Sequence, residues 1–137
     1  MPLLADTDGD GLPDQWEHRY GLDPNAAGAD HGPDGDPDQD GARNADEFRK
    51  GTHPRGLFRR YFAEGISSEF FTTTLALANP AEEPVTVVLS FFTSNATLAT
   101  LPVDLAPRSR ATINANDLPA IAGLAYSTTV EADALVV

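Results

Sequence analysis

The segment DTDGDGLPDQWE, residues 6–17, places oxygen-bearing side chains at positions 1, 3, 5, 9 and 12 of a twelve-residue loop, with glycine at position 6. Calcium takes roughly six to eight hard oxygen ligands, and alternating side chains on a tightly coiled loop can point at one centre. Glycine permits the sharp turn that a residue with a Cβ resists. This is the spacing of an EF-hand-type calcium loop, so the segment predicts a Ca²⁺ site.

The same spacing returns in DPDQDGARNADE, residues 36–47, at an offset of 30 residues (36 − 6). The offset also relates Gly21 to Gly51 and Pro24 to Pro54, which indicates one supersecondary unit used twice. We therefore expect two Ca²⁺ sites, each with a backbone carbonyl at position 7 and a ligand at position 9 that binds directly or through water. The expected ligands are Asp6, Asp8, Asp10, Leu12, Asp14 and Glu17 in the first loop, and Asp36, Asp38, Asp40, Ala42, Asn44 and Glu47 in the second.

A short helix is expected after each loop, over residues 13–20 and 43–50, and a glycine follows each. Leu12, Trp16 and Tyr20 recur every four residues and form one apolar stripe. We expect Phe48, with Ala45, to face this stripe and Trp16 to belong to the core of the small unit.

The segment between the two halves of the repeat, residues 25–35, is rich in Gly, Ala, Asp and Pro and is interpreted as a linker. Asp30 and Asp34 lie in it just before the second loop, where they either add ligands, bridge the two ions or are solvated. His18 and His53 are expected on the surface.

Residues 6–54 resemble the bacterial thrombospondin type 3 repeats, with their DxDxDGxxDxxE…GxxP pattern, and are more distantly similar to dockerins. The resemblance implies calcium-stabilised extracellular spacers or surface modules. Dockerins usually carry Asp at the last loop position, where this chain has Glu17 and Glu47, so cohesin binding is not the expected role.

From residue 57 onward the acidic residues thin out and β-type residues take over, in short runs separated by turn signals. Seven strands in about 80 residues fit an all-β, immunoglobulin-like sandwich. The motifs YFAEG, LALANP and SRATI (residues 61–65, 75–80 and 109–113) resemble a repeat of large bacterial secreted and surface proteins, which implies an extracellular structural repeat. The expected strands cover residues 58–63, 70–78, 85–93, 97–105, 109–115, 125–131 and 135–137.

Composition excludes several classes of function. The formal net charge is −12, and residues 1–56 carry 13 acidic and 5 basic side chains, against 8 and 4 in residues 57–137. Such a field repels phosphate, so nucleic acid is not an expected partner. The chain has no cysteine, which excludes disulfides and thiol chemistry. No apolar run approaches the roughly 20 residues of a transmembrane helix, and no catalytic motif stands out, so we do not expect an enzyme.

The sequence thus predicts a mixed fold: a small α calcium-loop domain at 1–56 and a β-sandwich at 57–137. The expected function is a calcium-stabilised structural module of an extracellular or cell-surface protein or filament. Its expected partners are further copies or neighbouring repeats of the same surface protein. The apolar end of the chain, residues 135–137, is interpreted as part of a longer polypeptide or as a strand exchanged between subunits. The alternatives are a calcium-dependent module that binds carbohydrate or protein, and an accessory domain of a secreted hydrolase.

Overall fold

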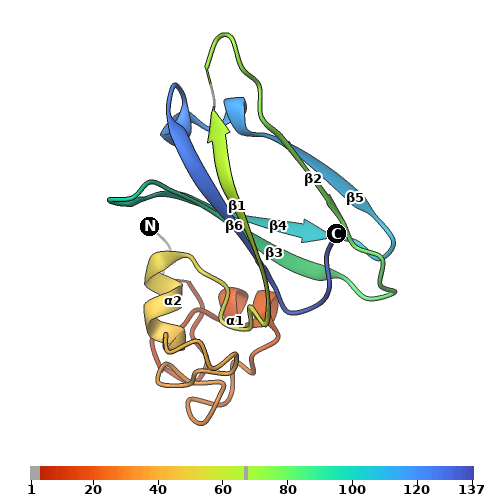
Figure 1. The fold of residues 1–137 in the computed structure, drawn as a ribbon. Coiled ribbons are helices and arrows are strands. Elements are labelled where there is room, and N and C mark those ends of the chain that lie inside the picture. Colours follow the sequence, from red (N-terminus) through yellow and green to blue (C-terminus); the bar gives the residue numbers. More distant parts are fainter. Residues whose placement is uncertain (1–3, 67) are drawn as a thin grey trace. The chain divides into compact units, whose positions relative to one another are not determined.

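The computed structural model of the chain describes residues 4–66 and 68–137 (Figure 1). The chain divides into two compact units, Met1–Gly56 and Leu57–Val137. The first holds two short helices and the second is built of antiparallel strands, as the sequence predicts. Within the described residues, neither helix has the length or apolar character needed to cross a membrane.

The two helices of the first unit are α1 (Asp14–Tyr20) and α2 (Asn44–Lys50), each directly after a loop. Both end where a glycine takes the left-handed conformation, Gly21 with φ 69° and Gly51 with φ 75°. Such glycines let the chain turn away while their N–H groups satisfy the last carbonyls of the helix. The helices therefore begin and end within one residue of the predicted bounds.

Aromatic side chains from both repeats form the core of this unit. The Trp16 ring lies 5.2 Å from Tyr20 and 5.5 Å from Phe48, both edge to face, so the predicted contact between the helices is confirmed. The Tyr20 ring lies 4.7 Å from His53. His53 is fully buried, and its Nδ1 accepts a hydrogen bond from the Arg55 N–H. The prediction of a surface position for His53 was wrong, because the ring fills the space beside Tyr20.

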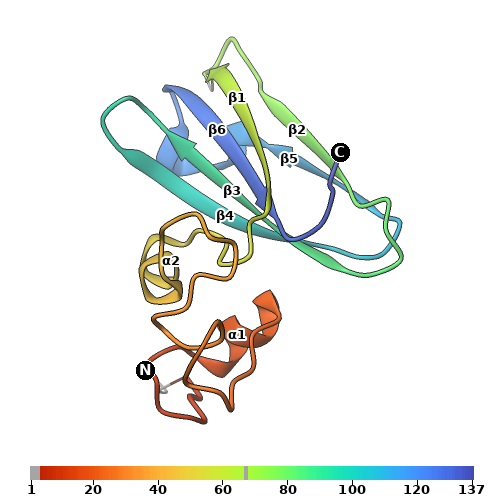
Figure 2. The same ribbon diagram turned by 60° about the horizontal axis from the view of Figure 1, so that its bottom comes forward.

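The second unit is a sandwich of two antiparallel sheets (Figures 1 and 2). The larger sheet has the strand order β1-β6-β3-β4 and the smaller one pairs β2 with β5. Two 3-10 turns, η1 (Ala115–Asp117) and η2 (Pro119–Ile121), separate β5 from β6. The strands are β1 (Phe58–Ile66), β2 (Thr74–Ala78), β3 (Val85–Phe92), β4 (Thr97–Leu105), β5 (Arg110–Asn114) and β6 (Ala125–Ala132).

The β3 residues that belong to the sandwich core show which face of the larger sheet points inward. Val87, Leu89 and Phe91 are fully buried in the sandwich core, and their cross-strand partners on β6 are Ala132, Val130 and Thr128. Because successive side chains of a strand point to opposite faces, every residue in these register positions faces inward. The same rule places Phe58 and Phe62 of β1 on the inner face, since they pair with Ala132 and Thr128.

The strands differ from the prediction at three places. β1 runs to Ile66, three residues past its expected end at residue 63. Residues 70–73 are not strand but a turn held by Asn116, whose Nδ2 donates to the carbonyls of Ser68 and Phe71. The predicted seventh strand, residues 135–137, forms a single antiparallel pair instead. Its last residue exchanges two backbone hydrogen bonds with Ala78 of β2, at 2.6 and 3.1 Å.

Candidate metal centre

The first loop is coiled around the carboxylate of Asp6. Its Oδ1 accepts from the N–H groups of Gly9 and Asp10, and its Oδ2 accepts from Gly11 at 3.0 Å. Asp10 in turn accepts from the N–H of Leu12 at 2.8 Å. Gly11 has φ 96°, a conformation that a residue with a Cβ rarely adopts, so the sequence needs glycine at this position.

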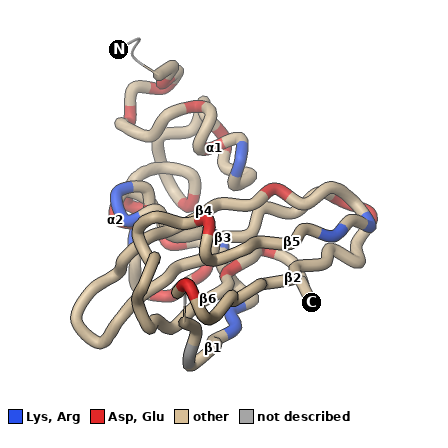
Figure 3. Tube along the Cα trace, turned by 90° about the horizontal axis from the view of Figure 1, so that it is seen from above, with Lys and Arg blue, Asp and Glu red and all other residues tan. Residues whose placement is uncertain are grey.

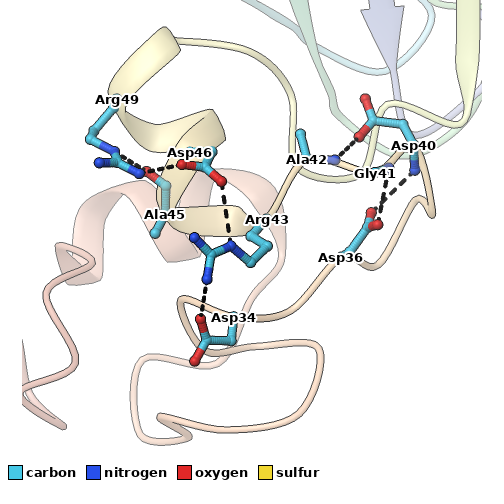
Figure 4. A network of polar contacts seen from close by, with 9 residues as sticks. All are labelled: Asp34, Asp36, Asp40, Gly41, Ala42, Arg43, Ala45, Asp46 and Arg49. Carbon is cyan, nitrogen blue, oxygen red and sulfur yellow. Dashed lines mark hydrogen bonds and ion pairs between the residues drawn. The ribbon is translucent and has the colours of Figure 1, made fainter.

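The second loop repeats these contacts at the offset of 30 residues. Asp36 accepts from the N–H groups of Asp40 and Gly41, and Asp40 accepts from Ala42 at 2.7 Å (Figure 4). Gly41 has φ 91°. The bond that closes each loop is repeated as well. The Asp14 N–H donates to the Ala5 carbonyl at 2.8 Å, and the Asn44 N–H donates to the Gly35 carbonyl, also at 2.8 Å.

Each loop brings three carboxylates together. Oxygens of Asp6, Asp8 and Asp10 lie within 4.8 Å of one another, and those of Asp36, Asp38 and Asp40 do the same. Acidic residues are frequent along the chain of this unit (Figure 3). Three carboxylates at such short range repel one another unless a cation or protons lie between them.

The carboxylate of Glu17 lies close to the first cluster of carboxylates. Its side chain is fully buried, and neither carboxylate oxygen has a hydrogen-bond partner among residues 4–66 and 68–137. The pKa of Glu17 is raised to about 7, first by burial and then by the nearby charges of Asp10, Asp8 and the other acids of the loop. A buried carboxylate without a donor is costly unless a cation binds it. The orphaned oxygens of Glu17 therefore fit the bidentate last ligand of a calcium loop.

Leu12 and Asp14 hold the first loop in its conformation. Leu12 is 1% exposed, so its side chain fixes the middle of the loop in the unit's core. Both oxygens of Asp14 accept hydrogen bonds from Thr7, from its N–H and its Oγ1, each at 2.7 Å. These bonds are the first cause of a lowered pKa for Asp14. Asp14 thus braces the start of the loop, and the structure does not bring its carboxylate into the group of Asp6, Asp8 and Asp10.

In the second loop, Asp38 and Glu47 are held by residues outside the motif. Asp38 Oδ2 accepts from the N–H of Gly56 at 2.8 Å. The pKa of Asp38 is raised to about 6, first by burial and then by the charge of Asp40. Glu47 is fully buried, and its Oε1 accepts from Thr52 Oγ1 at 3.2 Å. Sequence reasoning missed Gly56 and Thr52, because nothing in a loop pattern points to a partner several residues beyond it.

Asn44 connects the second site to the segment interpreted as a linker. Its buried Nδ2 donates to the carbonyls of Asp30 and Gly32 at 2.9 and 2.8 Å, which leaves Oδ1 as its free acceptor among the described residues. Asp34 pairs with Arg43 Nη1 at 2.9 Å and stays exposed (Figure 4). Asp30 therefore acts through its backbone and Asp34 through an ion pair. The structure assigns neither carboxylate to a metal cluster.

The chemistry of the donors selects the ion. Every side-chain donor in the two clusters is an oxygen, with no cysteine in the chain and no histidine in either group. Hard cations such as Ca²⁺ and Mg²⁺ prefer oxygen ligands, whereas zinc and copper prefer nitrogen and sulfur. Ca²⁺ accepts the higher ligand number and irregular geometry that a flexible coiled loop offers. The residues present therefore fit calcium.

Comparison with known families agrees with this chemistry. Residues 6–27 match the bacterial TSP3 repeat. The matched segment holds the first loop and all of α1, which confirms the resemblance seen in the sequence and supports calcium binding by this unit. The second loop lies outside the matched residues, but its hydrogen bonds repeat those of the TSP3 segment at a fixed offset.

Solved structures resemble the chain in fold. The Anabaena sensory rhodopsin transducer is similar with a TM-score of 0.50 and 17% identity, over 58% of this chain and 88% of the other. A Thermotoga maritima protein, 1070, has a TM-score of 0.49 and 15% identity, over 57% of this chain and 72% of its own. No curated protein matches the chain. At 17% identity, the Anabaena structure supports the β-rich fold of the chain and carries no information about activity.

Without metal, the TSP3-containing unit should gain helix on acidification. The pKa of Glu17, raised to about 7, and that of Asp38, raised to about 6, mean that the folded unit holds protons that the unfolded chain releases. This contribution to folding is fully present below the ordinary carboxyl pKa and is lost as pH rises through about 6–7. The pKa of Asp14 is lowered, so the effect of this carboxylate on folding falls at a pH below that range.

Circular dichroism in calcium-free buffer measures the effect. We expect the helical signal and the Trp16 emission of the folded unit to be stronger at pH 5.5 than at pH 8. In saturating Ca²⁺ the order should reverse, because protons compete with the ion for the same oxygens. If the helical signal of the metal-free protein instead rises with pH, the carboxylates of Glu17 and Asp38 do not have raised pKa values in the folded unit.

Proposed function

We propose that this protein is a calcium-stabilised, non-enzymatic structural module of an extracellular or cell-surface protein, with one Ca²⁺ in each loop. The observation that carries the proposal is the fully buried Glu17 carboxylate, which has no donor among the described residues and lies beside the acids of its own loop. Asp6, Asp8, Asp10 and Glu17 would hold the first ion, and Asp36, Asp38, Asp40, Asn44 and Glu47 the second. The carbonyls of Leu12 and Ala42 would complete the two sites.

The ion acts by linking binding to folding. The TSP3-containing unit is small and its apolar core consists of a few side chains around Trp16 and Tyr20, so burial offsets little of its chain entropy. Its clustered carboxylates repel one another in the absence of metal. Bound Ca²⁺ reverses that repulsion, and its binding free energy becomes folding free energy.

The expected Ca²⁺ affinity of such sites favours a location outside the cell. Extracellular calcium modules commonly bind in roughly the 10⁻⁴–10⁻³ M range. A site of that strength fills outside a cell and stays largely empty at cytosolic calcium. Removal of Ca²⁺ is therefore the test of the proposed function.

A second part of the proposed function concerns assembly. The pair between Ala78 and Val137 places the C-terminal segment on the outer edge of β2, and Val136 is only 5% exposed in the sandwich core. The same segment of a neighbouring copy could take the same position, because identical contacts form in either case. Strand exchange of this kind would connect modules into a filament.

Deletion of residues 135–137 should abolish such self-association. The variant loses the backbone pair to Ala78 and the buried Val136 side chain, which are the contacts that an exchanged segment would make. Sedimentation velocity over a range of concentrations in millimolar Ca²⁺ measures the outcome. Polymers that persist in the deletion variant would refute strand exchange, and so would a full-length chain that stays monomeric at every concentration.

A further inference from the structure

The two halves of the repeat differ in the turn that follows each helix. Residues 23–26 and 53–56 form the same turn, in which the N–H of the last residue donates to the carbonyl of the first, at 3.0 Å in one turn and 3.1 Å in the other. In the second turn this N–H, that of Gly56, also donates to Asp38 Oδ2 at 2.8 Å. Among the described residues, the first turn has no counterpart of that bond to a carboxylate of its loop.

Thr52 makes a similar difference at the last ligand position. Its Oγ1 donates to Glu47 Oε1 at 3.2 Å. The equivalent residue of the first half is Leu22, which has no hydroxyl, and Glu17 has no donor among residues 4–66 and 68–137. Two expected ligands of the second loop, Glu47 and Asp38, therefore accept hydrogen bonds from a segment that lies beyond α2.

The segment that supplies both donors, residues 52–57, joins α2 to β1 and is called the connecting segment. Its His53 side chain is fully buried against the ring of Tyr20. Its Arg55 donates its N–H to His53 Nδ1 at 3.0 Å and its Nη1 to the Gly21 carbonyl at 3.2 Å. The connecting segment is thus fastened along most of its length, and two of the bonds that fasten it end on expected calcium ligands.

We propose that the connecting segment is part of the second calcium site and is held or released with the ion of that site. Thr52 and Gly56 act as positioning residues, because they fix the directions of the Glu47 and Asp38 carboxylates. Outer partners of metal ligands are worth about 10–100-fold in affinity. By linkage, an ion that fixes these two carboxylates also strengthens their hold on the segment. The inference rests on the proposed function, since it requires Ca²⁺ in the second loop.

Electrostatics explain why the second ion should matter more than the first. Without metal, Asp38 is repelled by the other two carboxylates of its cluster, whose oxygens lie within 4.8 Å, so its bond to Gly56 is easily lost. A cation between the three carboxylates removes that repulsion. The contacts of the segment with the first half, at the Tyr20 ring and the Gly21 carbonyl, involve no expected ligand of the first loop.

Nuclear magnetic resonance of the full chain, labelled with a nitrogen isotope, tests this coupling during a Ca²⁺ titration. Three glycine amides serve as probes, each a donor to one carboxylate: Gly11 to Asp6 in the first loop, Gly41 to Asp36 in the second, and Gly56 to Asp38. In the Glu17→Gln variant the first loop should fill only at high Ca²⁺. We expect the Gly56 signal to change together with that of Gly41, and that of Gly11 to follow at a Ca²⁺ concentration about a hundredfold or more higher.

Thr52→Val and Thr52→Ser are a matched pair for the positioning role. Valine keeps the shape of the side chain and removes its hydroxyl, whereas serine keeps the hydroxyl and removes the methyl group. We expect Thr52→Val to raise the Ca²⁺ concentration at which the Gly41 and Gly56 signals change by about tenfold, and Thr52→Ser to leave it unaltered. If the serine variant is impaired as much as the valine variant, Thr52 acts by packing and its positioning role is refuted.

The three amide signals also separate failure of this inference from failure of the proposed function. A Gly56 signal that follows Gly11, or that does not respond to Ca²⁺ while Gly41 does, would overturn the coupling and leave both calcium sites standing. A Gly41 signal that does not respond to millimolar Ca²⁺ would refute the second calcium site, and the inference with it.

Discussion

Chelation of Ca²⁺ should unfold the first unit and leave the sandwich folded. The helical circular-dichroism signal of α1 and α2 should disappear, and the emission of Trp16, the only tryptophan in the chain, should shift to the red. The physical reason is that each site saturated at about a hundred times its Kd contributes about 2.7 kcal/mol to folding. Two such contributions are comparable to the whole stability of a small domain.

The sandwich provides the internal control for that experiment. Its core contains the fully buried Val87, Leu89 and Phe91 and no metal cluster among the described residues, so its β-type signal and its thermal transition should be unchanged by the chelator. Addition of excess Ca²⁺ should restore the Trp16 emission. A helical signal and an emission maximum that are the same with and without chelator would refute metal-coupled folding.

We expect Glu17→Gln to weaken Ca²⁺ binding at the first loop by about a hundredfold or more, since even outer partners of metal ligands are worth about 10–100-fold. The substitution keeps the size of a fully buried side chain but removes its charge and one of the two oxygens that would bind the ion. It also places an amide N–H₂ beside Asp10. Competition titration against a chromophoric chelator measures the affinity of each site.

Asp30→Asn is the matched control, because Asp30 contributes its backbone carbonyl to Asn44 and its carboxylate lies in neither metal cluster. Its two Ca²⁺ affinities should equal those of the unaltered protein. A Glu17→Gln variant with unaltered affinity at the first loop would show that this carboxylate does not bind the ion. A loss of affinity in Asp30→Asn would place Asp30 among the ligands after all.

The local features of the first unit could be predicted because each depends on neighbouring residues. Loop spacing alone places Asp6, Asp8 and Asp10 together, and Gly21 and Gly51 end the helices by their own backbone freedom. Strands β3, β4 and β6 were likewise found close to their bounds from alternation and turn residues. In the loops and at the helix ends the decisive contacts lie within a dozen residues of one another, and the strands were recognised from their local sequence although their pairing partners, such as those of β6 on β1 and β3, are distant.

The contacts that sequence reasoning missed are those between distant segments. His53 is buried because it meets the ring of Tyr20, and Asp38 is held by Gly56, 18 residues further along. Residues 70–73 have strand-like composition, but Asn116 holds them in a turn across more than 40 residues of chain. No local pattern encodes such partners, so composition alone assigned these residues to surface or strand.

The aromatic core shared by the two halves of the repeat has a consequence for how the protein responds to calcium. Trp16 of the first half touches Phe48 of the second, and Tyr20 touches His53. Neither half can melt without exposing rings of the other, so the first ion to bind orders part of the second site in advance. Uptake should therefore be cooperative, and the module should switch from flexible to rigid over a narrow span of calcium concentration. A chain of such modules would stiffen abruptly on reaching a calcium-rich medium.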